Sequence, residues 1–381
     1  MNNHKVHIVF VPENKHWGGS ELLWSKTALW LAKQNILVTV LKHERLKLPL
    51  WFVKESNNLD FLNIISSSKP KLSLIKRIWN RFVPYRFRFK AKNTRFSELA
   101  KIQPSLVVIN QGFNFNGVIT AIELNKLQIP YATISEAVNE GMWPILSLRE
   151  NMKLAFKESV MNYFVSQDNL EVTQMQLGCV LDNTEIVRHP FNVPFKSKNN
   201  YPKNQKLCLA VVGRYHFSSK GQDVILRVLN QEKWKEREIQ VNFYGSGDDI
   251  YNLKDVVSNF NLSNVKINEY TETSKIWENN HGLLLTSRYE GLPISIVEAM
   301  LSKRLVITTN VSGNKELLID NENAFIAAAP RPEYVDEALE RAWERRWEWK
   351  AMGEQAYSHI IQHIPEQPDN VFGEKLLELL K

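Results

Sequence analysis

The chain has 381 residues, and 44% of them are hydrophobic, which is enough for two cores and excludes a disordered or fibrous protein. Its two cysteines are too few for a disulfide framework. The formal net charge is +7, from 48 basic and 41 acidic side chains.

The N-terminal apolar run at residues 6–11 is too short and too poorly flanked for a signal peptide. No window approaches the roughly 18 consecutive apolar residues of a transmembrane helix. We therefore expect a cytoplasmic protein.

Apolar, strand-like runs alternate with helical patterns along the chain, which predicts the α/β class with parallel sheets covered on both faces. The first half contains runs at 6–12, 37–41, 59–65, 105–110, 131–135, 163–166 and 185–188. The second half contains runs at 206–213, 240–245, 265–270, 282–287, 305–309 and 324–327. A polar segment with two prolines, 194–205, predicts a linker between two similar halves.

A basic segment lies in the first half. Residues 61–97 contain no acidic residue but ten basic ones: Lys69, Lys71, Lys76, Arg77, Arg81, Arg86, Arg88, Lys90, Lys92 and Arg95. Without these ten the charge balance is 38 − 41 = −3, so the whole basic surplus lies at 69–95. Interleaved aromatic residues favour a surface for anionic lipid headgroups or a phosphorylated acceptor, and hence peripheral attachment to the inner face of the plasma membrane. A solvated loop and helix is the alternative; no nucleic-acid motif accompanies the segment, so we expect no nucleic-acid partner.

Two cations follow the first strand of the second half. The strand ends in Gly213-Arg214, and Lys220-Gly-x-Asp223 begins a helix. Arginine offers a planar fork to phosphate oxygens and lysine offers a point charge. The alternative is that both cations are simply solvated at a sheet edge.

Two glutamates lie eight positions apart at 287–300, in Ser-Arg-Tyr-Glu-Gly-Leu-Pro-Ile-Ser-Ile-Val-Glu-Ala-Met. A strand precedes them, so Glu290 is expected at the carboxyl edge of a sheet, where open α/β folds bind ligands. Pro293 suits the first helical position. Glu298 lies more than one turn into the helix, where it can reach a neighbouring hydroxyl.

The start of this helix also predicts an anion site. The backbone N–H groups of Gly291, Leu292 and Ile294 have no helical acceptor and are free to bind a phosphate. An ordinary strand, turn and helix with solvated glutamates is the competing interpretation.

These residues resemble glycosyltransferase family four, the retaining GT-B enzymes, whose hallmark is E-x7-E within E-G-[FL]-[PG]-x4-E-A-M. The 213–223 segment is similar to the family's G-R-x5-K-G-x-D signature, and residues 16–21 resemble its G-G-x-E loop. The resemblance implies Glu290, Arg214 and Lys220 as catalytic residues. It implies donor contacts at Gly18, Gly19, Gly213, Gly245, Tyr270, Thr271, Gly291, Leu292, Pro293, Ile294 and Glu298.

The acceptor side departs from the family pattern. Many members carry a histidine after the strand that corresponds to 131–135, whereas this chain has Ser135-Glu136. We predict acceptor contacts at Ser135 and Glu136, with Glu136 as a candidate base, and at Asn110, which ends the preceding strand. His16 and His189 are the candidate substitutes for the missing histidine.

The resemblance implies two Rossmann-like domains facing a cleft. It divides the chain into an acceptor-side domain (1–193), a linker (194–205), a nucleotide-sugar-binding domain (206–365) and a helix that crosses back (366–381). In the tail, the spacing of Trp343 and Trp347 predicts an amphipathic helix that packs both rings on the core.

The implied function is retaining transfer of a sugar from a nucleoside-diphosphate donor to a saccharide or lipid-linked saccharide acceptor, in cell-surface polysaccharide, lipopolysaccharide or glycolipid assembly. No cofactor and no metal are expected, since fixed cations serve the departing diphosphate. A nucleotide-sugar epimerase or hydrolase on the same fold, and a non-catalytic nucleotide-binding module, are the alternatives.

Overall fold

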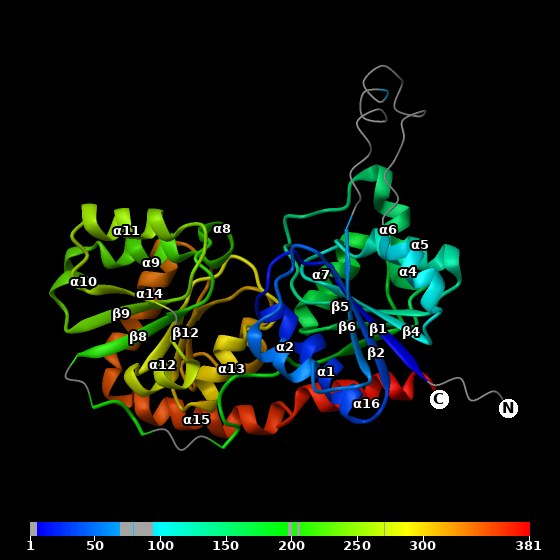
Figure 1. Ribbon diagram of the computed structural model, residues 1–381. Coiled ribbons are helices and arrows are strands. Elements are labelled where there is room, and N and C mark those ends of the chain that lie inside the picture. The colour runs from blue at the N-terminus through cyan, green and yellow to red at the C-terminus, as the bar shows by residue number, and fades with distance from the viewer. Residues whose placement is uncertain (1–5, 69–78, 80–93, 197–199, 204–205, 270) are drawn as a thin grey trace.

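The computed structural model describes residues 6–68, 79, 94–196, 200–203, 206–269 and 271–381. Two parallel sheets lie side by side, each with helices on both faces (Figure 1). In the described residues the first sheet has seven strands in the order β3-β2-β1-β4-β5-β6-β7, and the second has six in the order β10-β9-β8-β11-β12-β13. The predicted fold class is confirmed, and every predicted strand-like run forms a strand.

The first sheet is built from the N-terminal half. Its strands are β1 (His7–Pro12), β2 (Leu37–His43), β3 (Leu62–Ser67), β4 (Leu106–Gln111), β5 (Tyr131–Ser135), β6 (Met161–Phe164) and β7 (Thr184–Ile186). The helices are η1 (Gly19–Glu21), α1 (Leu22–Lys33), α2 (Leu50–Ser56), α4 (Thr94–Ile102), α5 (Val118–Leu127), η3 (Leu146–Leu148), α6 (Arg149–Lys157) and α7 (Gln167–Leu177).

The second sheet is built from the C-terminal half. Its strands are β8 (Leu207–Val212), β9 (Ile239–Tyr244), β10 (Val265–Asn268), β11 (Gly282–Leu285), β12 (Leu305–Thr309) and β13 (Ala324–Ala327). Its helices are α8 (Phe217–Lys220), α9 (Gln222–Leu229), α10 (Glu232–Glu236), α11 (Ile250–Asn259), α12 (Thr273–Asn279), α13 (Ile294–Leu301), η4 (Ser312–Leu317), α14 (Pro332–Glu344), η5 (Arg346–Glu348) and α15 (Trp349–His363).

Each sheet has an apolar core on both faces. In β4, Val108 belongs to one core of the first sheet, while Val107 and Ile109 belong to the core on the opposite face. In β8, Leu209 and Ala210 are divided in the same way between the two cores of the second sheet. Burial on both sides explains why these strands read as continuous apolar runs rather than alternating ones.

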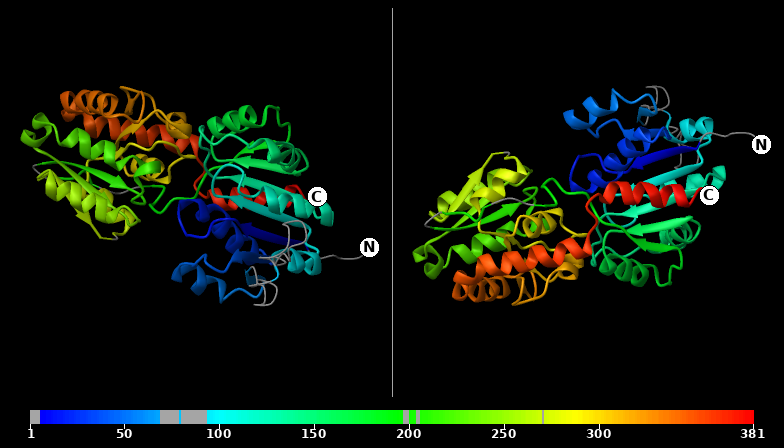
Figure 2. Two further views of the ribbon diagram at one scale, coloured as in Figure 1. Left: turned by 90° about the horizontal axis from the view of Figure 1, so that it is seen from above. Right: turned by 90° about the horizontal axis from the view of Figure 1, so that it is seen from below.

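The C-terminal tail spans the two units. Helix α15 places Ala356 and Ile360 in a core of the second sheet, and the last helix, α16 (Pro368–Glu378), packs against α1 of the first. The ring of Phe372 in α16 meets the ring of Tyr163 edge-on at 4.9 Å. The view from below in Figure 2 shows α15 under the second sheet and α16 under the first.

The two tryptophans near the end of α14 differ in burial. Helix α14 ends at Glu344, so Trp347 lies in the following η5 turn and is 71% exposed; the prediction that it packs on the core is wrong. Trp343 does pack there, beside the ring of Trp234. No helix in the described ranges is long and apolar enough to cross a membrane.

Candidate active site

Loops from the carboxyl edges of the two sheets meet between the domains. After β5, the backbone N of Val138 lies 3.4 Å from the backbone O of Glu290, which follows β11. After β8, Nη2 of Arg214 lies 3.5 Å from the backbone O of Trp17, which follows β1. Residues from both halves of the chain therefore lie in one region, as open parallel sheets allow.

Glu290 lies at the carboxyl edge of the second sheet, as predicted. Its side chain is nearly buried, and Oε1 accepts a hydrogen bond from Oγ of Ser287 at 2.6 Å and forms an ion pair with Lys220. Its backbone N donates to Oγ of Ser312 at 3.1 Å. Sequence reasoning missed Ser287 and Ser312, although Ser287 stands at the end of the strand, where a hydroxyl can fix the glutamate.

The helix after Glu290 begins one residue later than predicted. Helix α13 starts at Ile294, and Pro293 is its N-cap with ψ 122°, not its first helical residue. In the described part of the chain, the backbone N–H groups of Gly291, Leu292 and Ile294 donate to no protein acceptor. These three groups beside Glu290 form a set of donors that suits an anion.

A glycine turn positions Lys220 over Glu290. Gly221 has φ +62°, and a Cβ there would lie 2.0 Å from the backbone O of Thr286, so only glycine allows this contact. A bidentate ion pair between Arg288 and Asp223, at 2.7 and 2.9 Å, joins the same two loops. The Asp223 of the signature therefore has a structural partner that sequence reasoning did not identify.

Arg214 extends from the second domain toward the first. Its side chain is exposed, and Nη2 lies 3.0 Å from the position of a Cβ built on Gly18. A Cβ on the neighbouring Gly19 would lie 3.2 Å from Cδ1 of Ile294. The predicted donor residues of the two domains thus contact one another. Gly213 and Gly245 pack backbone to backbone behind Arg214.

Glu298 contacts Asn192, which lies just before the predicted linker. It is buried, and Oε1 accepts hydrogen bonds from the backbone N and from Nδ2 of Asn192, both at 2.9 Å. Burial raises its pKa to about 7, and the hydrogen bonds from Asn192 oppose that rise. Its predicted role toward a ribose stays a prediction.

The raised pKa of Glu298 has a consequence for stability. Its folded-state pKa of about 7 lies above the ordinary 4.5, so the stability it contributes is fully present below about pH 4.5 and is lost as pH rises through 7. Glutamine stays neutral and can accept the same hydrogen bonds. We therefore expect the free energy of unfolding of Glu298→Gln to exceed that of the parent. The expected difference is less than about 1 kcal/mol near pH 5 and up to about 3 kcal/mol at pH 8.

Urea unfolding of parent and variant at several pH values measures this difference. The control is Glu366→Gln, which makes the same change at an exposed glutamate. If the unfolding free energies of Glu298→Gln and the parent differ by the same amount at every pH from 5 to 8, the raised pKa of Glu298 is contradicted.

Beneath the Gly18–Gly19 loop lies a second buried carboxylate, Glu21. Oε2 accepts from the backbone N of Gly18 and from Oγ of Ser20, both at 2.8 Å, and Oε1 accepts from Nδ2 of Asn14 at 2.7 Å. Burial raises its pKa to about 7 against these hydrogen bonds. Glu21 therefore fixes the loop that contacts Arg214.

The three predicted acceptor residues are all buried. Asn110 donates from Nδ2 to the backbone O of Ser20 at 3.1 Å and so supports the same loop, and Oγ of Ser135 lies 3.5 Å from Nε2 of Gln111. Oε2 of Glu136 lies 3.0 Å from Nε2 of His189. Burial raises the pKa of Glu136, and the neighbouring His189 opposes the rise.

Several predicted residues are placed away from this cluster or are not described. Thr271 donates from Oγ1 to the backbone O of Glu269 at 3.0 Å, and Tyr270 lies outside the described residues. Nine of the ten basic residues at 69–95 lie outside them as well. The tenth, Arg95, is buried with Nη1 at 2.6 Å from Oε1 of Glu13, so it is wrong to count it in an exposed basic surface.

Comparison with known proteins identifies a family match in the second half of the chain. Residues 193–359, less than half of the chain, match the family model described as Glycosyl transferases group 1. A poly(ribitol-phosphate) alpha-N-acetylglucosaminyltransferase of Staphylococcus aureus is 30% identical over 111 residues, which are 28% of this chain and 22% of that protein. An uncharacterized glycosyltransferase of Haemophilus influenzae is 29% identical over 133 residues, 34% of this chain and 37% of that protein. The matched segments span less than half of either relative.

The likeness to solved structures covers nearly the whole chain. A crystal structure of Anabaena Alr3699/HepE in complex with UDP matches 98% of this chain and 100% of that chain, with a TM-score of 0.75 and 15% sequence identity. Both parallel-sheet domains and their arrangement are shared. The fold is GT-B. Within this GT-B architecture the group 1 match falls on the second domain, which carries Arg214, Lys220 and Glu290.

Proposed function

We propose that this GT-B chain is a retaining glycosyltransferase of family four, which moves a sugar from a nucleoside-diphosphate donor to an acceptor hydroxyl without a bound metal ion. The observation that carries the proposal is the convergence of Lys220, Glu290 and the open N–H groups of 291–294 at one sheet edge, with Arg214 nearby. The group 1 match supports it, because all of these residues lie within 193–359.

In the proposed reaction, the bond between the anomeric carbon and a phosphate oxygen breaks, and negative charge grows on the departing diphosphate. Lys220 and Arg214 stabilise that charge. Glu290 binds sugar hydroxyls and favours positive charge at the anomeric carbon. The acceptor oxygen bonds to this carbon on the face from which the diphosphate leaves, and its proton passes to a phosphate oxygen.

The structure holds Lys220 against Glu290, so donor binding exchanges partners within an existing cluster. The diphosphate takes the ammonium group, and a sugar hydroxyl donates to the carboxylate in its place. Glu136 and His189 are the proposed acceptor-side groups, because they lie close to the Glu290 loop: the backbone O of Glu136 would be 2.0 Å from a Cβ on Gly291.

UDP is the first nucleotide to test, since the crystal structure of HepE that resembles this chain holds UDP. Calorimetry with UDP, GDP and ADP, each with and without a chelator, tests the donor site. Chelator-insensitive binding of one nucleotide is the expected result. Binding that requires a divalent cation would overturn the metal-free proposal, and no binding at all would count against the donor site.

The reaction products distinguish a transferase from the two alternatives, an epimerase or hydrolase and a non-catalytic binding module. A transferase consumes donor in proportion to acceptor, whereas an epimerase or hydrolase turns over donor alone and a binding module leaves donor intact. Chromatography of the nucleotide sugar with and without candidate saccharide acceptors distinguishes all three. Acceptor-independent turnover at an unchanged rate would favour the epimerase or hydrolase.

We also propose that the acceptor is presented at an anionic membrane surface. The support is the basic, aromatic-rich stretch at 69–92, whose nine basic residues remain when the buried Arg95 is left out, in a chain of otherwise acidic balance. Replacing Lys76, Arg77, Arg81, Arg86 and Arg88 by glutamine is expected to abolish sedimentation with vesicles that contain anionic lipid, because about 1 kcal/mol per basic residue near the surface is lost. Replacing Lys233, Lys235 and Arg237 is the control. A parent protein that never sediments with such vesicles would refute the idea.

A further inference from the structure

A groove lies between the first domain and the C-terminal helix, next to Asn192, which precedes the predicted linker; neither Lys220 nor Glu290 lines it. Its volume is about 350 Å³, within the range of about 300–1,000 Å³ typical of small-molecule sites. Helices α1 and α2, residue 192 and the first turn of α16 form its walls, and these helices are neighbours in Figure 1. We call it the linker groove; the residues that matter are Trp30, Trp51, Asn192, Asp369 and Asn370.

Two tryptophans supply the apolar part of the linker groove. Trp51 is 37% exposed, and its ring meets the ring of Trp17 at 6.0 Å and 80°. Trp30 packs on α16 at Gly373, where a Cβ would come within 2.4 Å of its ring. Both indoles are therefore held by neighbours rather than free to rotate, and they offer fixed apolar surface at little entropic cost.

Amide and carboxylate groups supply the polar part. Asn192 donates both its backbone N and Nδ2 to Glu298, and in the described residues its Oδ1 accepts no hydrogen bond. Asp369 is fixed through its backbone O, which accepts from Oγ1 of Thr27 at 3.1 Å. The side chains of Asp369 and Asn370 also line the groove. Such groups accept from and donate to vicinal hydroxyls.

The charges that line the groove cancel. Two lysines, Lys26 and Lys33, stand against two acids, Glu55 and Asp369. Lys33 pairs with Glu55 at 3.2 Å, and Nζ of Lys26 donates to the backbone O of Phe191 at 3.3 Å. The four charged side chains of the lining therefore sum to zero, and a groove without net charge favours a neutral ligand over an anionic one.

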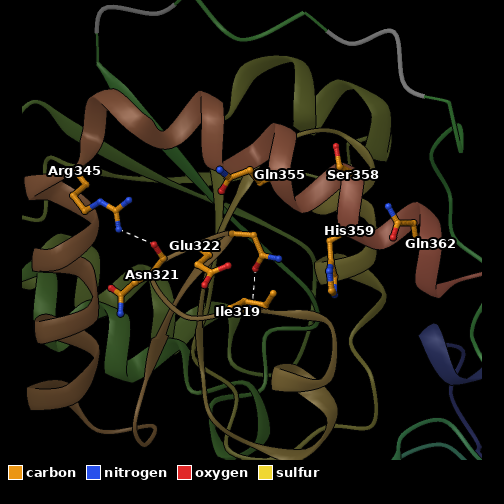
Figure 3. A pocket seen from close by; sticks show the side chains of 9 residues that line it. Ile319, Asn321, Glu322, Arg345, Gln355, Ser358, His359 and Gln362 are labelled. Atoms are coloured by element: carbon orange, nitrogen blue, oxygen red, sulfur yellow. Dashed lines mark hydrogen bonds between the residues drawn. The ribbon is translucent and has the colours of Figure 1, made fainter.

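A larger groove on the second domain, of about 560 Å³, lacks this combination. Figure 3 shows polar side chains from α15, among them Gln355, Ser358 and His359, facing the loop at 319–323. There Arg345 donates to the backbone O of Asn321 at 2.7 Å, and among the described residues neither a tryptophan nor a tyrosine lines the groove. It offers no flat apolar face to a ring.

We propose that the linker groove is a saccharide subsite, separate from the donor site, that takes a neutral pyranose unit. The apolar face of the ring packs on Trp51 and Trp30, and its hydroxyls bind Asp369, Asn370 and Oδ1 of Asn192. Because Asn192 also holds Glu298, a sugar bound here contacts a residue of the first domain that is bonded to α13 of the second. Binding in the groove does not depend on the proposed transfer reaction.

Saturation-transfer NMR and calorimetry with maltotriose, cellotriose and N,N′-diacetylchitobiose test this subsite in the full chain without any donor. We expect at least one of these neutral sugars to bind the parent. Trp51→Ala is expected to weaken that binding by about tenfold, the effect of losing one ring contact worth ~1.4 kcal/mol. Asp369→Ala should weaken it as well, and it keeps the test decisive if Trp51→Ala fails to fold.

Matched controls separate this groove from the donor site. Trp347→Ala removes a tryptophan of the second domain that is more exposed than Trp51, 71% against 37%, and should leave sugar binding unchanged, as should Arg214→Ala. Sugar binding that is lost in Arg214→Ala but kept in Trp51→Ala would overturn the proposal and place the sugar in the donor site. Failure of all three sugars to bind the parent, or tighter Trp51-dependent binding of glucose 6-phosphate, would also overturn it.

Discussion

Replacing Lys220 by alanine is expected to lower the rate of sugar transfer by about 10²–10³-fold, the loss that follows removal of one fixed electrostatic group from an active site. The side chain of Lys220 is 26% exposed and that of its partner Glu290 is 10% exposed. A charge in such a partly buried site acts through a lower effective dielectric than a surface charge does. The affinity for the nucleotide should fall as well as the rate, because the ammonium group of Lys220 binds the diphosphate both before transfer and in the transition state.

The matched control is Lys233→Ala. Lys233 lies in α10 of the second domain and forms ion pairs with two acids of α14, Asp336 at 2.8 Å and Glu340 at 3.0 Å. Steady-state rates and nucleotide titrations of both variants, with thermal melts to check folding, measure the effect. Equal losses of transfer rate in Lys220→Ala and Lys233→Ala would show that the loss comes from lower stability. Full activity of Lys220→Ala would refute the proposed catalytic role of Lys220.

Much of this architecture can be predicted from the sequence because the signals are local. A doubly covered parallel sheet needs apolar runs, and each run at 6–12, 206–213 or 282–287 carries that signal within itself. The place of Glu290 at the sheet edge follows from the strand before it and the glycine and proline after it. The glycine at 221 likewise marks the turn that brings Lys220 to the edge.

Partners distant in the sequence could not be predicted. Glu298 accepts a hydrogen bond from Asn192, which lies 106 positions away. Glu136 and His189 were each singled out in the sequence, but their contact with one another was not predicted. Arg95 lies in the basic segment of the sequence and was therefore predicted at the surface, but it is buried and forms an ion pair with Glu13. These pairs depend on how the strands are ordered in the sheets, and neither spacing nor periodicity encodes that order.

Ends of helices were the other source of error. Pro293 fits both the N-cap and the first helical position by its fixed φ, and only the ψ of 122° decides between them. The i, i+4 spacing of Trp343 and Trp347 predicts a shared face only if the helix continues, and α14 ends at Glu344. The tail resumes as a separate helix, α15, at Trp349, which is buried in its own right.

Gly291→Ala is expected to lower transfer about a hundredfold, a loss of the size that a misplacement of about 1 Å can cause, while each domain stays folded. A Cβ at this position would lie 2.0 Å from the backbone O of Glu136 and 2.6 Å from Cγ2 of Val165, both on the first domain. A backbone oxygen on a sheet edge cannot move aside as a flexible side chain can. The added methyl group therefore forces the two domains apart at the point where Gly291 meets Glu136.

This substitution tests whether the contact between the domains is required for transfer. Gly141→Ala is the control, because a Cβ there meets only the side chain of Asn139, at 3.3 Å. Small-angle scattering should show a larger radius of gyration for Gly291→Ala alone. Nucleotide binding should fall far less than transfer, since alanine keeps the backbone N–H at position 291 and Lys220 remains on the same domain. If Gly291→Ala keeps both the scattering profile and the rate of the parent, transfer proceeds without this domain contact.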